Sequence, residues 1–150
     1  MKKAILLLIL CISAFAAKAE TFFESCEKIQ GASTIYVSKA MISMAGNLDI
    51  VDGDVDLNSL ASKIDGLWVV TGEGKTAAEI KNKAKTALDT SKYEKLLSVK
   101  EDSQNVDIMM RSGNGNKNEC IVYATEPSET TVIIITGTFT LQDIIKATKR

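Results

Sequence analysis

The sequence predicts an α+β fold, a two-layer sandwich in which helices pack on one face of a mainly antiparallel sheet of about five to six strands. Apolar residues alternate with period two in four successive segments of the C-terminal half, a pattern typical of strands. The links between these segments are short, and short links require antiparallel neighbours because a parallel crossover needs roughly a dozen residues. Helical patterns with one apolar side precede and follow the strands, and each must bury that side against the sheet.

The four C-terminal strands form a predicted meander. The residues that alternate along them are Leu97 and Val99, then Val106, Ile108 and Met110, then Cys120, Val122 and Ala124, then Val132 and Ile134. The polar links at residues 101–104, 112–118 and 126–129 join them, and the second link is rich in asparagine and glycine, as hairpin turns require. Thr140 and Asp143 then have the spacing of a helix cap, so we expect a last helix to begin there.

The N-terminal half adds two predicted strands and four predicted helices. Short runs of β-branched, aromatic and aliphatic residues indicate strands at 33–37 and 67–71. The helices are expected to begin at the cap Thr21, after Ser38, at the cap Asp56 and at the cap Thr76. The two early strands can lie beside each other or flank the meander, and the sequence leaves both arrangements open.

The first 19 residues have the pattern of a cleaved signal peptide. A lysine pair precedes an apolar run at residues 4–17, and Ala17-Lys18-Ala19 is a small-x-small cleavage site. The run is shorter than the roughly 20 residues that span a bilayer, so we expect no transmembrane anchor in the mature chain. We therefore expect a protein exported to the periplasm or secreted, with a single domain at residues 20–150.

Charge and cysteine content limit the function classes of the mature domain. Three of the 18 basic residues lie in the signal peptide, so 15 basic and 19 acidic residues remain, a net charge of −4. This mildly acidic chain has no basic patch for nucleic acid, and we expect no nucleic-acid partner. Two mature cysteines, Cys26 and Cys120, are either a disulfide, as an oxidising compartment favours, or two buried thiols.

The residues needed for most catalytic sites are missing. The chain contains no histidine, which excludes Ser-His-Asp and Cys-His catalysis and histidine-ligated zinc. Gly74-Lys75-Thr76 resembles the end of a phosphate-binding loop, but Val69 stands where its first glycine should be, so we interpret the segment as a turn and a helix cap. We expect no cofactor and no enzyme activity. A carboxylate-dependent glycan hydrolase remains the alternative, because two carboxylates are enough for that chemistry.

An acidic loop is a weak candidate calcium site. Asp52, Asp54 and Asp56 match the first three ligand positions of an EF-hand-like loop. Leu57 stands where that loop needs glycine and Lys63 where it needs glutamate, so an ordinary solvated loop is the competing interpretation. A calcium-steadied binding domain is therefore a second alternative.

One face of the meander is the predicted interaction surface. We expect the sheet face without helices to carry Asp107, Met109 and Arg111 on one strand and Ile121, Tyr123 and Thr125 on the next. Mixed apolar and charged side chains suit a protein interface. The expected function is thus a non-catalytic macromolecule-binding module whose partner is an envelope protein or a glycan, with a homodimer also compatible. The competing interpretation is that helices cover both faces of these strands.

The whole pattern resembles the bacterial domain-of-unknown-function family 4252. The resemblance rests on STIYVSKAMISM at residues 33–44 and LNSLASKIDGLWVV at residues 57–70, together with the lysine-bearing helix, the meander and the short last helix. It implies a small exported protein of Gram-negative bacteria with no assigned activity. Some members are lipoproteins, but Leu10 before Cys11 does not fit a lipoprotein signal here. The resemblance supplies no functional residues.

Overall fold

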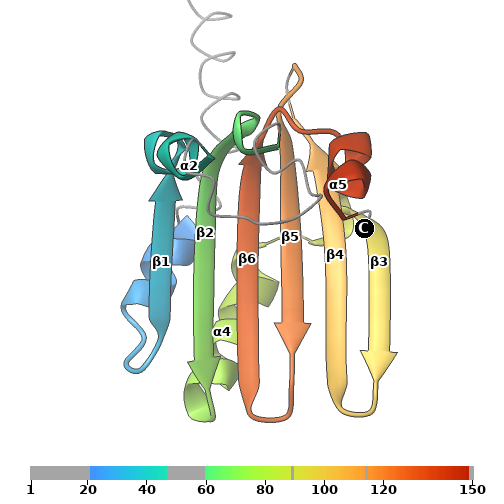
Figure 1. The fold of residues 1–150 in the computed structure, drawn as a ribbon. Coiled ribbons are helices and arrows are strands. Elements are labelled where there is room, and N and C mark those ends of the chain that lie inside the picture. Colours follow the sequence, from blue (N-terminus) through green and yellow to red (C-terminus); the bar gives the residue numbers. More distant parts are fainter. Residues whose placement is uncertain (1–20, 47–59, 89, 114, 149–150) are drawn as a thin grey trace, which may run out of the picture.

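A computed structural model of the chain describes residues 21–46, 60–88, 90–113 and 115–148, which form a six-stranded antiparallel sheet with helices (Figure 1). The strands are β1 (Ser33–Ser38), β2 (Ile64–Glu73), β3 (Glu94–Glu101), β4 (Gln104–Ser112), β5 (Asn118–Thr125) and β6 (Glu129–Gly137). The main helices are α2 (Lys39–Gly46), α4 (Lys75–Ala87) and α5 (Leu141–Thr148), with a 3-10 turn at Thr90–Lys92 and a helical segment at residues 21–27. The predicted α+β fold is confirmed.

The strand order is β1-β2-β6-β5-β4-β3, so the two early strands lie side by side and extend the meander at β6. Every pair of neighbours is antiparallel, and the short links predicted this for the three pairs of the meander, β3–β4, β4–β5 and β5–β6. The strand predicted at residues 67–71 is longer and begins at Ile64. Most of the helix predicted to begin at Asp56 lies outside the described residues.

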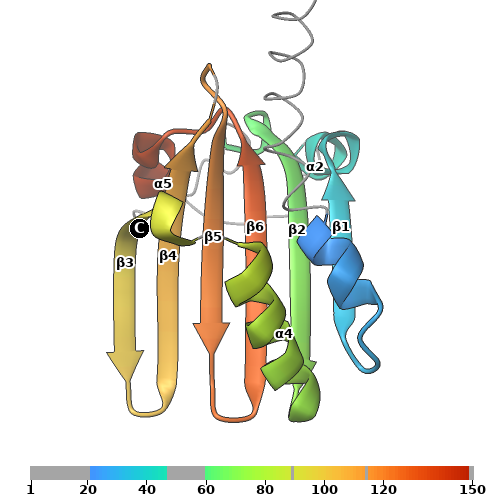
Figure 2. The same ribbon diagram turned by 180° about the vertical axis from the view of Figure 1, so that it is seen from behind.

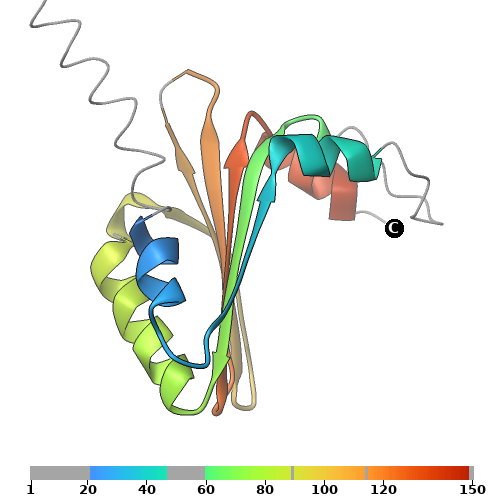
Figure 3. The same cartoon turned by 90° about the vertical axis from the view of Figure 1, so that its left-hand side faces the viewer.

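The helices divide between the two faces of the sheet. The segment 21–27 and α4 pack on one face, here called the covered face, whereas α2 and α5 stand at the upper end of the opposite face, here called the open face (Figures 2 and 3). The core lies on the covered face and consists of Phe22, Cys26, Ile29, Trp68, Val70, Ile80, Ala84, Leu88, Met109, Ile121, Val132 and Ile134. Within the described ranges, no helix is long and apolar enough to cross a bilayer.

Close contact between α4 and β2 depends on a glycine in β2. A Cβ atom at Gly72 would lie 2.6 Å from Thr76 Cγ2 and 2.7 Å from Ile80 Cδ1, so glycine lets the helix approach the strand. The helix cap is Gly74, two residues earlier than the predicted cap, and no side chain caps the helix. The predicted cap at Thr76 is therefore wrong. The Thr76 hydroxyl instead donates to the Gln30 carbonyl at 3.0 Å and ties α4 to the N-terminal segment.

The last helix begins at the predicted cap. The Thr140 backbone N–H donates to Asp143 Oδ2 at 2.7 Å, and the Asp143 backbone N–H donates to Thr140 Oγ1 at 3.2 Å. Three further bonds fix the corner between β6 and α5. Thr138 N donates to the Lys63 carbonyl (2.8 Å), Asn118 Nδ2 donates to the Phe139 carbonyl (2.7 Å), and Lys63 Nζ pairs with Asp143 Oδ1 (2.7 Å).

This cap should make part of the stability depend on pH. The Lys63 ammonium and the Thr140 backbone N–H lower the pKa of Asp143 from 3.8 to about 2. Because the folded-state pKa lies below the unfolded value, the stabilisation is present above about pH 4 and is lost as the pH falls through 2. We expect Asp143→Asn to lower the melting temperature at pH 6, and the difference from wild type to shrink steadily between pH 4 and pH 2.

Thermal melting of both proteins across this range is the measurement. The control is Glu79→Gln, which removes a carboxylate from the exposed surface of α4 and should show a smaller difference. A difference at pH 6 that persists unchanged at pH 2 would contradict the assignment.

Candidate functional site

The open face carries an aliphatic row that crosses all six strands. Strand register pairs each member of the row with the next: Ile35, Val69, Ile133, Val122, Ile108 and Leu97. Their chain neighbours Trp68, Ile134 and Ile121 point to the covered face and are buried in the core. Because side chains alternate along a strand, the row must point the other way, away from α4.

A second apolar row lies above the first, toward α2 and α5. It consists of Val37, Leu67, Ile135, Cys120 and Met110, again paired in register across five strands. Below the first row, Ala124, Val106 and Val99 continue the apolar surface on the meander side, beside Thr71 and Thr131, whose hydroxyls bond to each other at 3.0 Å. Leu97 is 48% exposed and Ile35 52%, so this surface reaches both edges of the sheet uncovered.

Glutamates border the lower end of the open face. Glu73 and Glu129 lie opposite each other on β2 and β6, Glu101 ends β3, and Glu126 lies in the β5–β6 turn. Glu126 accepts a hydrogen bond from Gln104 Nε2 at 2.8 Å, and Glu129 accepts one from the Thr71 hydroxyl at 3.4 Å. We call these four residues the acidic rim.

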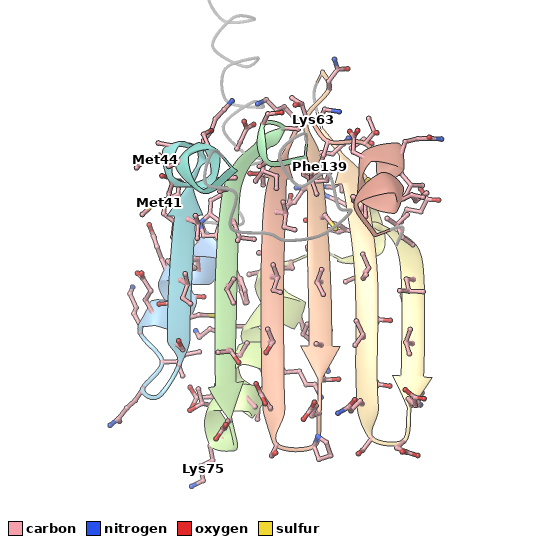
Figure 4. All side chains as sticks on the ribbon, viewed as in Figure 1. Met41, Met44, Lys63, Lys75 and Phe139 are labelled. Atoms are coloured by element: carbon pink, nitrogen blue, oxygen red, sulfur yellow. The ribbon has the colours of Figure 1, made fainter. Side chains whose placement is uncertain are left out.

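Two helices border the upper end of the open face. Met41 and Met44 lie exposed on α2 beside β1 (Figure 4). Leu141 and Ile145 are exposed on α5. Since thioether side chains adapt to different shapes, exposed methionines are common at binding surfaces. The apolar surface of the sheet is thus accompanied by apolar groups on both helices.

Ion pairs attach this upper end to the first residues of β2. Asp65 accepts hydrogen bonds from Lys39 at the start of α2 (3.3 Å) and from Lys117 in the β4–β5 turn. Partial burial opposes ionisation of Asp65, but hydrogen bonds from Lys117 and Lys39 outweigh it and lower the pKa of the carboxyl. Together with the Lys63–Asp143 pair, these contacts fix α2 and α5 relative to the sheet.

The predicted interaction surface lies on the other side of the sheet. Met109, Ile121 and Thr125 are 6%, 1% and 7% exposed on the covered face, so the prediction that they face a partner is wrong. Tyr123 packs against the same core, and burial followed by the Asp107 carboxylate raises its pKa. Sequence spacing correctly grouped these residues on one face but did not show which face the helices cover.

The polar members of that predicted surface have partners within the chain. Arg111 Nη2 lies 2.9 Å from the fully buried Glu119 carboxylate, and its guanidinium lies 5.0 Å from the centre of the Tyr93 ring. Asp107 accepts a hydrogen bond from the Ser98 hydroxyl at 2.6 Å and faces Lys95 at 3.5 Å. These contacts pair, within the chain, polar side chains that the sequence indicated as groups for a partner.

Of the two arrangements that the sequence left open for Cys26 and Cys120, the structure has the buried thiols and no disulfide. Both are free and buried. Cys26 belongs to the core on the covered face, whereas Cys120 lies on the open face in register with Ile135 and Met110, so the sheet separates them. Burial, followed by the charge of Glu119, raises the pKa of Cys120 to about 11, and burial raises that of Cys26. Neither thiol is therefore activated as a nucleophile.

The remaining predicted sites give no chemical centre. The calcium candidates Asp52, Asp54 and Asp56 lie outside the described residues, and no group of three or more metal-ligating side chains occurs in the described ranges. At the glycine-rich turn, the Gly74 N–H donates to the Ser128 carbonyl at 2.8 Å. That bond occupies a donor that a phosphate would need. The turn joins β2 to α4, and Lys75 points away from the sheet at its lower end (Figure 4).

Fold and surface together define a small α+β domain in which, among the described residues, helices close one face of the sheet and cover only the upper end of the aliphatic opposite face (Figure 3). Residues 25–147 match the family described as domain of unknown function DUF4252, and the chain belongs to that family. A comparison with curated proteins found no match, and a comparison with solved structures found none.

Proposed function

We propose that this is an exported, non-catalytic binding protein of the bacterial cell envelope, and that the open face of the sheet binds another protein. One observation carries the proposal: an aliphatic row crosses six strands and ends at side chains about half exposed, Ile35 and Leu97. Large continuous apolar surfaces of this kind mark interaction sites in monomeric domains. The signal-peptide pattern in the first 19 residues supports an envelope location.

The side-chain chemistry of the open face favours a protein over a glycan. Sugar-binding surfaces use aromatic rings that stack on the sugar. Here Trp68, Tyr36 and Tyr123 all lie on the covered side of the sheet, and Trp68 packs against Tyr36 with 5.2 Å between ring centres. The open face offers aliphatic groups and methionines instead, which suit the apolar centre of a protein interface.

Site-specific photocrosslinking in intact cells tests this function. A photoreactive amino acid would replace Ile133 or Val122 in the centre of the aliphatic row, and Lys81 on the exposed surface of α4 as the matched control. We expect a discrete crosslinked protein from positions 133 and 122 and none from position 81. Adding Val69→Lys should remove the product, because a charge in this row would have to be desolvated on binding.

Folding must be verified for each variant by circular dichroism and thermal melting. Since the three open-face positions are not fully buried, we expect melting temperatures close to wild type. Equal products from both sides of the sheet, or no product from the open face, would overturn the proposed function.

A further inference from the structure

We propose that the open face binds a second copy of this chain, with a two-fold axis in the plane of the interface and perpendicular to the strands. The upper end of one copy then meets the lower end of the other. This inference rests on the proposed function and names its partner. A two-fold dimer requires a surface that complements itself, because both copies present the same patch.

The charges at the two ends of the open face are complementary in this arrangement. The upper end carries Lys39, Lys63 and Lys117, with Asp65 and Asp143 between them, and Glu94 of β3 lies there opposite Met110, so these six charges cancel. The acidic rim at the lower end carries four glutamates, and none forms an ion pair with another described residue. Turning the second copy upside down brings its glutamates to these lysines.

The opposite orientation is disfavoured by the same charges. With both copies pointing the same way, the two acidic rims would face each other across the interface. Like charges placed opposite each other cost free energy and discriminate against a wrong arrangement. Only the inverted dimer brings each rim next to groups of opposite sign.

The position of α2 and α5 also favours the inverted dimer. Both helices stand above the open face at its upper end and leave the middle and lower part uncovered (Figure 3). Packed sheets lie about 10 Å apart, and a helix packed on a sheet occupies a layer of about the same depth. The sheet of an inverted second copy therefore fits in the layer of α2 and α5, with its lower end against them. In the parallel orientation the two helix layers would collide.

The projected area of the open face is more than half of what a stable dimer buries on each partner. Six strands spaced about 4.8 Å apart give a width of roughly 25 Å, and five to six residues at about 3.3 Å give a length of nearly 20 Å. The projected area is thus on the order of 500 Å². Side chains protrude from the sheet and therefore have more surface than the flat projection. Together with the exposed groups on α2 and α5, they increase the contact area toward the roughly 800 Å² per partner of stable interfaces.

Sedimentation velocity of the protein purified from cells that express the full chain tests the dimer. We expect a dimer at micromolar concentration, weakened roughly a hundredfold by Ile133→Glu at the centre of the interface. Glu126→Lys should weaken it several-fold, because lysine would then face lysine in the inverted dimer, and Lys117→Glu should do the same by placing a glutamate opposite the rim.

Mixing the two charge variants is the decisive control. In the inverted arrangement, each end of a Glu126→Lys chain meets an end of opposite charge on a Lys117→Glu chain, so the mixture should form a heterodimer about as stable as the wild-type dimer. In the parallel arrangement the mixture would instead bind more tightly than wild type, because wild-type chains would there face like charges. If Glu126→Lys associates as tightly as wild type, the inverted orientation is wrong.

Failure of this inference can be separated from failure of the proposed function. A wild-type chain that stays monomeric up to about 100 μM, while position 133 still crosslinks to a different protein, would overturn the dimer and leave the binding function standing. A monomer without any crosslink from the open face would overturn both.

Discussion

Replacing Arg111 with alanine should lower the free energy of unfolding by about 3–5 kcal/mol, because it removes one partner of a buried ion pair. Arg111 is 13% exposed and Glu119 is fully buried, and the two residues lie directly opposite each other on β4 and β5. Without the guanidinium, the Glu119 carboxylate stays in the protein interior without its cation. The loss of the guanidinium from the Tyr93 ring adds a smaller destabilisation. Urea unfolding monitored by circular dichroism measures the change.

A double substitution separates the contribution of the ion pair to stability from the contribution of side-chain packing. In Arg111→Met/Glu119→Leu both charges are replaced by apolar groups of similar volume, and such replacements are often neutral or stabilising. We expect this variant to recover most of the stability lost in Arg111→Ala. A matched surface control is Lys95→Ala, since its pair with Asp107 spans 3.5 Å and the lysine is 56% exposed, so the expected cost is below about 1 kcal/mol. A similar loss of unfolding free energy in Arg111→Ala and Lys95→Ala would show that burial of the Arg111–Glu119 pair is unimportant.

Arg111 also shows why the interaction surface could not be assigned from the sequence. Alternation alone puts Arg111, Met109 and Asp107 on one side of a strand, and this grouping is correct. Choosing the buried side requires knowing where the helices pack, and here they cover the side that contains the charges. The chain can bury these charges because Glu119 and Ser98 supply partners from neighbouring strands. A pairing across strands depends on register, which the sequence pattern does not reveal.

Local signals were more informative than long-range ones. The cap at Thr140 was predictable because its partner Asp143 is three residues away and the helix needs a hydrogen-bond acceptor at that point. Thr76 has the same spacing to a carboxylate, yet its hydroxyl bonds to Gln30, 46 residues earlier. The antiparallel meander was likewise predictable from short links, whereas the position of β2 between β1 and β6 follows from tertiary packing. The bare aliphatic row became visible only after register placed six residues from six strands side by side.

The tight crossing at the upper end of the sheet gives the second large expected effect. A Cβ atom at Gly137 would lie 2.0 Å from the Lys63 carbonyl oxygen and 2.9 Å from Ile64 Cα, so Gly137→Ala forces backbone against backbone. Gly137 does not have a positive φ, and the need for glycine here is therefore one of space. The clash lies where the register between β2 and β6 shifts, next to the bond from Thr138 N to the Lys63 carbonyl.

We expect Gly137→Ala to cost about 3 kcal/mol or more, at the upper end of what overpacking costs, because backbone atoms cannot rotate away as a side chain can. Gly72→Ala is the matched control: its Cβ would meet the ends of Thr76 and Ile80 at 2.6 and 2.7 Å, and these side chains can shift, so the expected loss is nearer 1–2 kcal/mol. Urea unfolding gives both values, and hydrogen exchange at the Thr138 amide reports whether the corner that holds α5 has opened. Equal losses of unfolding free energy in the two variants, or a protected Thr138 amide in a destabilised Gly137→Ala protein, would contradict this account.

An opened corner would also release the Lys63–Asp143 pair that fixes α5 beside the open face. We therefore expect Gly137→Ala to lose the proposed dimer and to show faster hydrogen exchange at the Thr138 amide.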